Sequence, residues 1–316
     1  MFTVTSLPLA IAFCVVTMIG WGSWANTQKL AGRDHWPFSL YYWDYALGVV
    51  LLAVALLVTL GGGSLGDPGG DAVLRAALSG LLFNIANILL VVAIDLAGMS
   101  VAFPVGVGLA LVIGTVASYL QQPQGNPSIL FAGVALNVFA MIMSALAYRT
   151  LPRPAGSGWS KGVAYSVLAG CLMGYFYPQL SQSISPGGLT PYAALLYFSL
   201  GLVASNFAVN SIFMRSSGQS YRDYFAGSPR LHSLGLLGGM IWMLALSLNI
   251  LASGVAGPAI SYALGQGATL VAAIWGVFIW REFRHAPPAA TRYIVLMFAG
   301  YAVGLVLIGM ATLPNT

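Results

Sequence analysis

Charged residues are scarce in this sequence. They make up 6% of its 316 residues, whereas a soluble globular domain carries about 25%. Hydrophobic residues make up 59%, and the mean hydropathy is +0.86. A surface with this composition cannot face water over most of its area. The composition therefore excludes an ordinary soluble domain and predicts an integral membrane protein.

Residues that bind metals or carry out covalent chemistry are also few. The sequence has two cysteines and three histidines, and no histidine has a neighbour at metal-ligand spacing. Cys14 and Cys171 lie in hydrophobic runs, where buried thiols are a simpler interpretation than a disulfide. We expect His35, His232 and His285 in loops. Because hydrolase and phosphate-loop motifs are missing as well, we predict no enzyme, no metal site and no cofactor.

Long apolar runs occupy most of the chain. Each approaches the roughly 20 residues that a helix needs to cross the hydrocarbon core of a bilayer. The runs lie near 7–29, 38–60, 73–95, 99–120, 127–149, 160–182, 191–214, 232–254, 256–280 and 292–313. They do not alternate in polarity as the strands of a membrane barrel do. The predicted fold class is therefore all-α, with ten transmembrane helices.

The loops between these helices differ in their content of basic residues. Cytoplasmic loops carry an excess of Lys and Arg. One side holds eleven basic residues: Lys29, Arg33, Arg149, Arg153, Lys161, Arg215, Arg222, Arg230, Arg281, Arg284 and Arg292. The other side holds Arg75 alone. We therefore predict a plasma-membrane protein (inner membrane in a bacterium) with both termini outside the cytoplasm and, because residues 1–28 carry no Lys or Arg, no cleaved signal peptide.

Weak internal matches recur along the chain at an offset of 154 residues. They are Gly20-Trp21 with Gly174-Tyr175, Pro37 with Pro191, and "VAFP" at 101–104 with "VAGP" at 255–258. Each half has five helices, an odd number, so the two halves must insert in opposite directions. We predict one membrane domain made of two inverted repeats, 1–150 and 151–316, an architecture found in many secondary transporters.

Several aromatic and amide side chains lie within the predicted helices. They should face the bundle interior, because lipid offers polar groups no hydrogen-bond partner. Aromatic faces beside neutral amides suit a small uncharged solute. The candidate substrate-binding residues are Trp21, Trp24, Gln28, Tyr42, Asn84, Asn87, Tyr175, Gln179, Asn206 and Gln266. The alternative role of each amide is a hydrogen bond between helices.

Asp44 is the only carboxylate clearly within a predicted helix, about two turns into the second run. Burial disfavours the charged form of a carboxylate, so Asp44 is a candidate to bind a coupling proton. The alternative is a structural hydrogen bond or ion pair near the membrane interface. Lys29 is interpreted as marking the cytoplasmic boundary of the first helix.

Glycine and proline patterns predict kinks and close helix contacts. Pro104, Gly106 and Gly108 in the fourth helix recur in kind as Pro258, Gly265 and Gly267 in the ninth, where they permit kinks. Gly300 and Gly304 form a G-x-x-x-G pair, which suits either helix packing or a dimer face. The corresponding prediction is a homodimer through the fifth and tenth helices.

Five segments resemble the ureide permeases, which belong with the glucose/ribose porters in the drug/metabolite transporter superfamily. They are "GMSVAFPVGVGLALVIGTVASYL" (98–120), "WGVFIWREFR" (275–284) followed by "TRYIVLMFAG" (291–300), "GWGSW" (20–24) and "YYWDY" (41–45). The resemblance implies ten helices, with the fifth and tenth peripheral to a central cavity. It also implies proton-linked or gradient-driven uptake of small neutral solutes, either ureides and nucleobase-like compounds or sugars. Plant members carry a long cytosolic loop between the halves, whereas here only 150–159 separate the two runs.

The leading hypothesis is thus a secondary permease that takes up a small neutral polar metabolite by alternating access. The alternative is an exporter of cationic or lipophilic drugs from the same superfamily. Such an exporter usually needs a carboxylate deep in the membrane, and the first helix has none. A non-transporting receptor would leave the inverted repeat without a role.

Overall fold

The computed structural model consists of helices and their connections over the residues that it describes, which are 1–66, 69–151, 158–184 and 187–313. Arg153, one of the basic residues counted above, lies outside these ranges. The elements are α1 (Leu7–Ser23), α2 (Ala25–Arg33), α3 (Phe38–Thr59), α4 (Gly70–Ala97), α5 (Met99–Gln121), α6 (Pro127–Arg149), α7 (Trp159–Ser183), α8 (Pro191–Ser216), α9 (Tyr221–Phe225), α10 (Pro229–Ala256), α11 (Pro258–Gly265), α12 (Ala268–Ile274), the π-helix η1 (Trp275–Ile279) and α13 (Pro288–Met310).

Nine helical segments of the described chain are long and apolar enough to cross a membrane. The protein is therefore an all-α integral membrane protein. Helix α7, with 25 residues, is also long enough but is not among the nine. Its sequence contains Gln179, Gln182 and Pro178, which lower its hydropathy.

Proline occupies one of the first two positions of α1, α6, α8, α10, α11 and α13. Its ring fixes φ at a helical value, and the missing N–H would have had no partner there. The side chains of Asn126 and Thr190 accept hydrogen bonds from the first N–H groups of α6 and α8. These local signals explain why the helices begin close to where the apolar runs predict.

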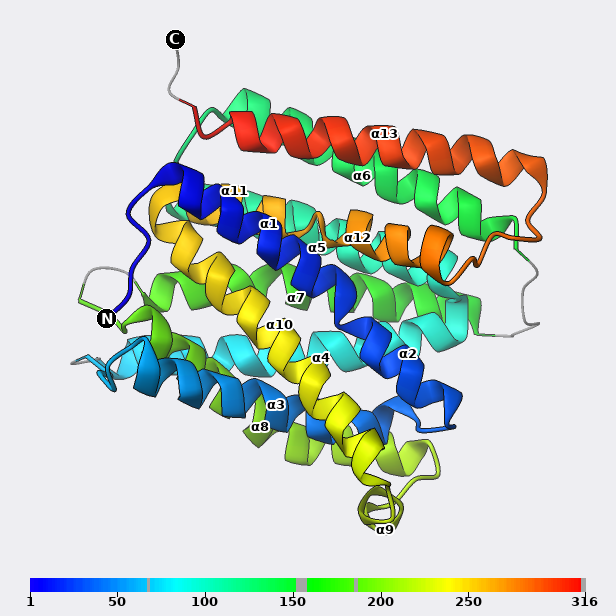
Figure 1. Cartoon of the computed structure of the whole chain (residues 1–316), viewed down its shortest axis with the longest axis horizontal. Coiled ribbons are helices and arrows are strands. Elements are labelled where there is room, and N and C mark those ends of the chain that lie inside the picture. Colours follow the sequence, from blue (N-terminus) through cyan, green and yellow to red (C-terminus); the bar gives the residue numbers. More distant parts are fainter. Residues whose placement is uncertain (67–68, 152–157, 185–186, 314–316) are drawn as a thin grey trace.

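The helices form one bundle with two distinct edges (Figure 1). Helices α6 and α13 lie side by side along one edge, and α3 and α8 lie at the opposite edge. Helices α1, α4, α5, α7 and α10 fill the space between them. The start of α1 and the end of α13 lie at the left end in Figure 1, whereas α2 and α9 lie toward the right. We call this second end the basic end, because Lys29, Arg33, Arg149, Arg230, Arg281 and Arg284 lie there.

Glycines allow the central helices to cross at very short distances. A Cβ atom at Gly48 would lie 2.2 Å from a backbone carbonyl of α10, and one at Gly239 would lie 2.0 Å from a backbone carbonyl of α3. Gly80 and Gly201 form the crossing of α4 and α8 in the same way. Because the obstructing atoms are backbone, no larger side chain fits unless the helices separate.

The glycine pair of α13 packs within the chain. A Cβ at Gly304 would lie 2.4 Å from Oδ1 of Asn137, and one at Gly300 would lie 3.1 Å from Cβ of Ala140, both in α6. The glycine pair therefore serves packing between α6 and α13 and is not open to a second copy of the chain.

The segment Pro258–Ile279 is discontinuous. Its α-helical structure stops at Gly265 and resumes at Ala268, and η1 follows from Trp275. The break lies at the glycines that the sequence marks as helix breakers. By contrast, α5 runs continuously through Pro104.

Single glycines connect α4 to α5 and α10 to α11. Gly98 has φ of 81° and Gly257 has φ of 85°, a conformation that side chains with a Cβ rarely adopt. Pro258 directly follows its glycine and begins α11, whereas Pro104 lies six residues after Gly98. Relative to these two glycines, the prolines of "VAFP" and "VAGP" therefore lie at different positions.

Candidate functional site

A pocket of about 490 Å³ lies near the basic end. Its walls come from α2, α5, α6, α12, η1 and α13, with Gly22 of α1 at its inner margin. It therefore draws on elements from both halves of the chain. Most of the lining is apolar, including Phe103, Met141, Ala272 and Ala273. Its volume falls within the usual range of small-molecule sites, about 300–1,000 Å³.

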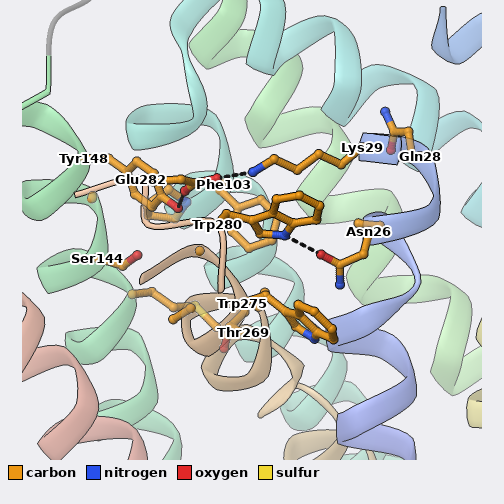
Figure 2. Close-up of a pocket in the computed structure, with 18 of the residues that line it drawn as sticks. Asn26, Gln28, Lys29, Phe103, Ser144, Tyr148, Thr269, Trp275, Trp280 and Glu282 are labelled. Carbon is orange, nitrogen blue, oxygen red and sulfur yellow. Dashed lines mark hydrogen bonds and ion pairs between the residues drawn. The ribbon is translucent and has the colours of Figure 1, made fainter. Parts of the chain in front are cut away.

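A network of paired side chains borders this pocket. Nζ of Lys29 forms an ion pair with Oε1 of Glu282, and the Tyr148 hydroxyl donates to Oε2 of the same carboxylate at 2.6 Å. Trp280 donates through Nε1 to Oδ1 of Asn26 at 2.6 Å. Figure 2 shows Trp280 between Lys29 and Asn26, and Lys29 lies 4.5 Å from its ring centroid. These contacts join α2, α6 and the segment after η1.

The ion pair makes the pocket lining neutral overall. Among the described residues, Lys29 and Glu282 are the only charged side chains that line it. Their side chains are 40% and 28% exposed, so water can reach this part of the pocket. Lys29 is therefore a partner in a contact between helices as well as a residue at the end of its helix.

The far end of the pocket approaches the break between α11 and α12. Thr269, the second residue of α12, lines it and donates to the carbonyl oxygen of Gln266 at 3.0 Å. Next to the break, a Cβ at Gly265 would lie 2.8 Å from the Trp21 ring. The discontinuous helix therefore brings its backbone against the Trp21 ring of α1, and such breaks often accompany binding sites in transporters.

Aromatic side chains gather at the centre of the bundle. Trp21 stacks on Trp242 with ring centroids 6.1 Å apart, and Phe83 lies 4.2 Å from Trp242. Trp24 lies 5.0 Å from Tyr45, which stacks on Tyr42 at 5.2 Å. We call these six residues, with Asn84 and Asn87, the central cluster: Trp21, Trp24, Tyr42, Tyr45, Phe83, Asn84, Asn87 and Trp242.

Several polar atoms of the central cluster have no hydrogen-bond partner among the described residues. They are the hydroxyls of Tyr42 and Tyr45, Oδ1 of Asn84 and Nδ2 of Asn87. Asn84 is fully buried and donates through Nδ2 to Oγ of Ser205 at 2.9 Å. Buried polar groups in proteins are normally paired. Unpaired groups in one place are therefore candidates to bind water or a polar solute.

The structure thus brings together five of the ten predicted substrate-binding residues: Trp21, Trp24, Tyr42, Asn84 and Asn87. Gln266 lies at the helix break beside them, and Gln28 lines the basic-end pocket. Asn206 is fully buried in α8 and borders a separate groove formed by α3, α8 and α9.

Two predicted residues of α7 lie elsewhere. Tyr175 is 47% exposed and faces away from the cluster. Gln179 accepts a hydrogen bond from Arg75 at 3.2 Å, near the end opposite the basic end. The predicted partners Gly20-Trp21 and Gly174-Tyr175 pack differently, because Gly20 lies against α10 whereas Gly174 lies against α5.

Sequence reasoning missed the inward-facing tyrosine of α7. Tyr177 donates to Oδ1 of Asn249 at 2.6 Å, and its ring lies 4.7 Å from that of Tyr262. Nδ2 of Asn249 in turn donates to the carbonyl oxygen of Ser261. Asn249 and Tyr177 are polar residues within apolar runs, and this position in the sequence could have identified them as facing the interior.

Asp44 is buried between α3, α9 and α10. Its Oδ1 accepts a hydrogen bond from the Tyr224 hydroxyl at 2.8 Å, and Nδ1 of His232 lies 2.8 Å from its Oδ2. The prediction that His232 lies in a loop is wrong, because the residue is in the first turn of α10. Helix α10 begins at Pro229, three residues before the apolar run, because proline favours the first turn of a helix.

Among the described residues, no group of three or more His, Cys, Asp or Glu side chains is placed to hold a metal ion. Cys14 and Cys171 are both free thiols.

Comparison with known proteins identifies the family. The sequence profile of the family described as sugar transport protein matches residues 11–313. The chain belongs to this family. Ureide permease 1 of Arabidopsis thaliana is 21% identical over 384 aligned positions, which cover 96% of this chain and 97% of that protein. The resemblance to the ureide permeases is thereby confirmed, and the protein is a membrane transporter for small solutes and not an enzyme.

A solved crystal structure supports the same fold. It is 14% identical in sequence and superposes with a TM-score of 0.64, covering 94% of this chain and 96% of that one. At this level of identity the likeness concerns the fold alone.

Proposed function

We propose that this sugar transport family member is a secondary permease that takes up a small, uncharged, hydrogen-bonding metabolite, either a ureide or nucleobase-like compound or a sugar. The observation that carries the proposal is that the pocket lining has no net charge, whereas the central cluster contains polar atoms without hydrogen-bond partners among the described residues. The only charges lining the basic-end pocket pair with each other, while the central cluster offers unpaired hydroxyl and amide groups beside indole rings. A charged solute would find no unpaired counter-charge there.

Alternating access between two inverted five-helix repeats, 1–150 and 151–316, is the proposed mechanism. Two glycine crossings support the repeat: α3 with α10, and α4 with α8. Counting membrane segments in order, α3 and α8 are the second and seventh, and α4 and α10 are the third and eighth. Segments two and eight therefore form one crossing, and segments seven and three form the other. Each segment of one crossing has its counterpart, five places along the chain, in the other crossing, as the repeat requires. Gly98 and Gly257 also connect corresponding segments with the same backbone conformation.

The proposed orientation places the basic end in the cytoplasm and both termini outside. Single cysteines in a background without Cys14 and Cys171 test this orientation. A membrane-impermeant maleimide should label Thr3→Cys from outside intact cells and should label Ser217→Cys only after permeabilisation. Both positions are exposed, so a difference between them reports their side of the membrane. The reverse pattern would overturn the assignment.

We further propose that uptake is coupled to protons through Asp44. The test is transport by the purified protein in proteoliposomes with radiolabelled allantoin, uracil, ribose and glucose, with and without an inward proton gradient. The proposal predicts that at least one solute accumulates above equilibrium and that the gradient is required. Loss of preloaded solute from the lumen, driven by the same inward proton gradient, would instead favour an exporter that exchanges solute for protons. Transport of none of the four would contradict the proposed substrate class.

A further inference from the structure

The Asp44 cluster, made of Asp44, Tyr224 and His232, shares no residue with the pocket or with the central cluster. Asp44 is in α3, Tyr224 in α9 and His232 in α10. None of the three lines the basic-end pocket. The Asp44 side chain is 4% exposed and that of His232 is 25% exposed. The carboxylate is therefore buried, and the imidazole is partly accessible from the surface.

We infer that Asp44 and His232 form a single-proton binding site whose occupancy controls whether the short helix α9 stays docked on α3. The inference rests on the proposed proton-coupled transport and names the regulation of its proton site. It assigns His232 as the second member of the proton site and Tyr224 as the residue that ties α9 to it.

Charge balance at the buried pair supports one proton per site. With an ionised Asp44 and a neutral imidazole, Nδ1–H donates to Oδ2 and the pair carries a net charge of −1. One added proton makes the pair neutral, whether the proton lies on the imidazole or on the carboxylate. Because Nδ1 of His232 and Oδ2 of Asp44 lie 2.8 Å apart, both groups contact the added proton.

Other charged groups nearby do not compensate this site. The titratable and charged groups on the neighbouring elements are Tyr41 of α3, Arg215 of α8, Arg222, Asp223 and Tyr224 of α9, Arg230 and His232 of α10, and Lys29, Arg33, Asp34 and His35 of α2 and the loop after it. Among the described residues, hydrogen bonds to Asp44 come from Tyr224 and His232. Arg230 is held by Asp34 at 2.7 Å, and Lys29 by Glu282.

The groups on α9 keep one protonation state while the pair titrates. Hydrogen bonds from Ser220 lower the pKa of Asp223, so this carboxylate remains ionised. Burial raises the pKa of Tyr224, so its hydroxyl keeps the proton that it donates to Asp44. The change in charge is therefore confined to Asp44 and His232.

Loss of the proton should separate α9 from α3. A net charge of −1 in a dehydrated site is costly, and water can lower this cost only by entering between the elements. The neutral pair, by contrast, is compatible with the packed arrangement, in which the His232 ring lies against Trp36 and Tyr224 at 5.7 and 4.9 Å. Low pH therefore favours docked α9, and high pH favours its release.

Cross-linking between α9 and α3 tests the inference without any solute. Leu47 of α3 and Phe225 of α9 border the same groove, and both are exposed. The double variant Leu47→Cys/Phe225→Cys, in a background without Cys14 and Cys171, is treated with a short bifunctional thiol reagent across about pH 5 to 8, the range in which histidine changes charge. The same cysteine pair with Asp44→Asn is the matched control, because its thiol chemistry is identical.

The inference predicts that the cross-linking ratio of the Asp44 protein to the Asp44→Asn protein falls several-fold as pH rises. The amide stands in for the neutral pair, so Asp44→Asn should stay docked at every pH. His232→Gln should shift the midpoint of the pH dependence, and Tyr224→Phe should lower cross-linking at every pH without removing that dependence. A cross-linking ratio that stays constant from about pH 5 to 8 would overturn the inference. If Asp44→Asn fails to fold, the test is the midpoint of the pH dependence of cross-linking, and an unchanged midpoint in His232→Gln would overturn the inference.

This outcome is separable from that of the transport assay. A protein that transports none of the four solutes yet shows the pH-dependent ratio would retain the proton site and refute the proposed substrate class. A protein that accumulates a solute with a flat ratio would retain the proposed uptake and lose the control by α9.

Discussion

Polar side chains that border the basic-end pocket pair with one another, whereas several in the central cluster have no partner among the described residues. At the basic end, Lys29 pairs with Glu282, Trp280 donates to Asn26, and Asp44 accepts two hydrogen bonds. In the central cluster, Tyr42 and Tyr45 have hydroxyls without partners among the described residues, and the amides of Asn84 and Asn87 are each incompletely paired. The two regions differ in pairing although both contain aromatic and amide side chains.

This difference suggests different roles for the two regions: unpaired groups can bind a solute, whereas paired groups hold helices together. A buried polar group without a partner costs about 1–3 kcal/mol, which a solute or ordered water can recover by supplying the missing hydrogen bond. Binding of a polar solute to the central cluster is therefore favoured by the hydrogen bonds that it supplies. The paired groups of the basic end gain nothing comparable, and their bonds must break when elements there move apart. We expect substitutions at the two regions to have different consequences.

The largest expected effect is at Asp44. Asp44→Asn should abolish gradient-driven accumulation but leave solute counterflow, because the amide resembles the neutral carboxyl group and cannot release a proton. Both are measured on the same purified variant in proteoliposomes. Asp34→Asn, at an exposed ion pair with Arg230, is the matched control and should retain both activities. Uphill transport by Asp44→Asn would remove Asp44 from the coupling mechanism.

A second test compares two buried asparagines. Asn87→Leu should lower counterflow roughly 5- to 150-fold, which corresponds to about 1–3 kcal/mol for a lost hydrogen bond to the solute. Its melting temperature should change little, because Nδ2 of Asn87 has no hydrogen-bond partner among the described residues. Asn137 in α6 is also buried and unpaired, but it packs against α13, away from the centre. Asn137→Leu should preserve counterflow, so equal losses in both variants would contradict a binding role for Asn87.

A smaller effect is expected at Trp21. Trp21→Ala should lower counterflow about 2- to 10-fold, since aromatic stacking contributes about 0.5–1.5 kcal/mol beyond area burial. Trp21→Phe keeps a ring against Trp242 and should retain more activity than Trp21→Ala. Trp159→Ala, at a 56% exposed position of α7, controls for the loss of an indole. Equal activity of Trp21→Ala and wild-type protein would exclude Trp21 from the binding site.

The smallest effect is expected at the ion pair that borders the pocket. Partly exposed pairs contribute only about 0–1 kcal/mol, so Lys29→Gln and Glu282→Gln should each change counterflow by no more than about 5-fold. The double variant should lie closer to wild type than either single variant, because it leaves no unpaired charge. Additive losses in the double variant would show that the two residues act separately.

Sequence patterns predicted much of the helical framework. Apolar runs placed every long helix to within a few residues, and the glycines at 265 and 267 marked the break in Pro258–Ile279. Five predicted residues meet in the central cluster because i, i+3 spacing puts Trp21 and Trp24, and likewise Asn84 and Asn87, on one helix face. Such predictions rely on local geometry, which the sequence specifies directly.

The remaining side chains could not be placed from local geometry. Tyr175 and Tyr177 are two residues apart, so they point in nearly opposite directions around α7, and only packing against α5 and α10 decides which faces inward. The partnership of Asp44 with His232 joins residues 188 positions apart. The pocket likewise combines α2, α6 and α12, whose proximity no sequence spacing indicates.

The sequence by itself determined that this chain resides in a membrane, where its helices begin and end, and which side chains are too polar to face lipid. The tertiary structure decided which of those side chains are paired and which are left without partners. The physical reason is that membrane insertion depends on the summed hydropathy of each segment, whereas pairing depends on helix rotation and separation. Those two quantities are set here by backbone contacts at Gly48, Gly80, Gly201 and Gly239, between helices far apart in the sequence.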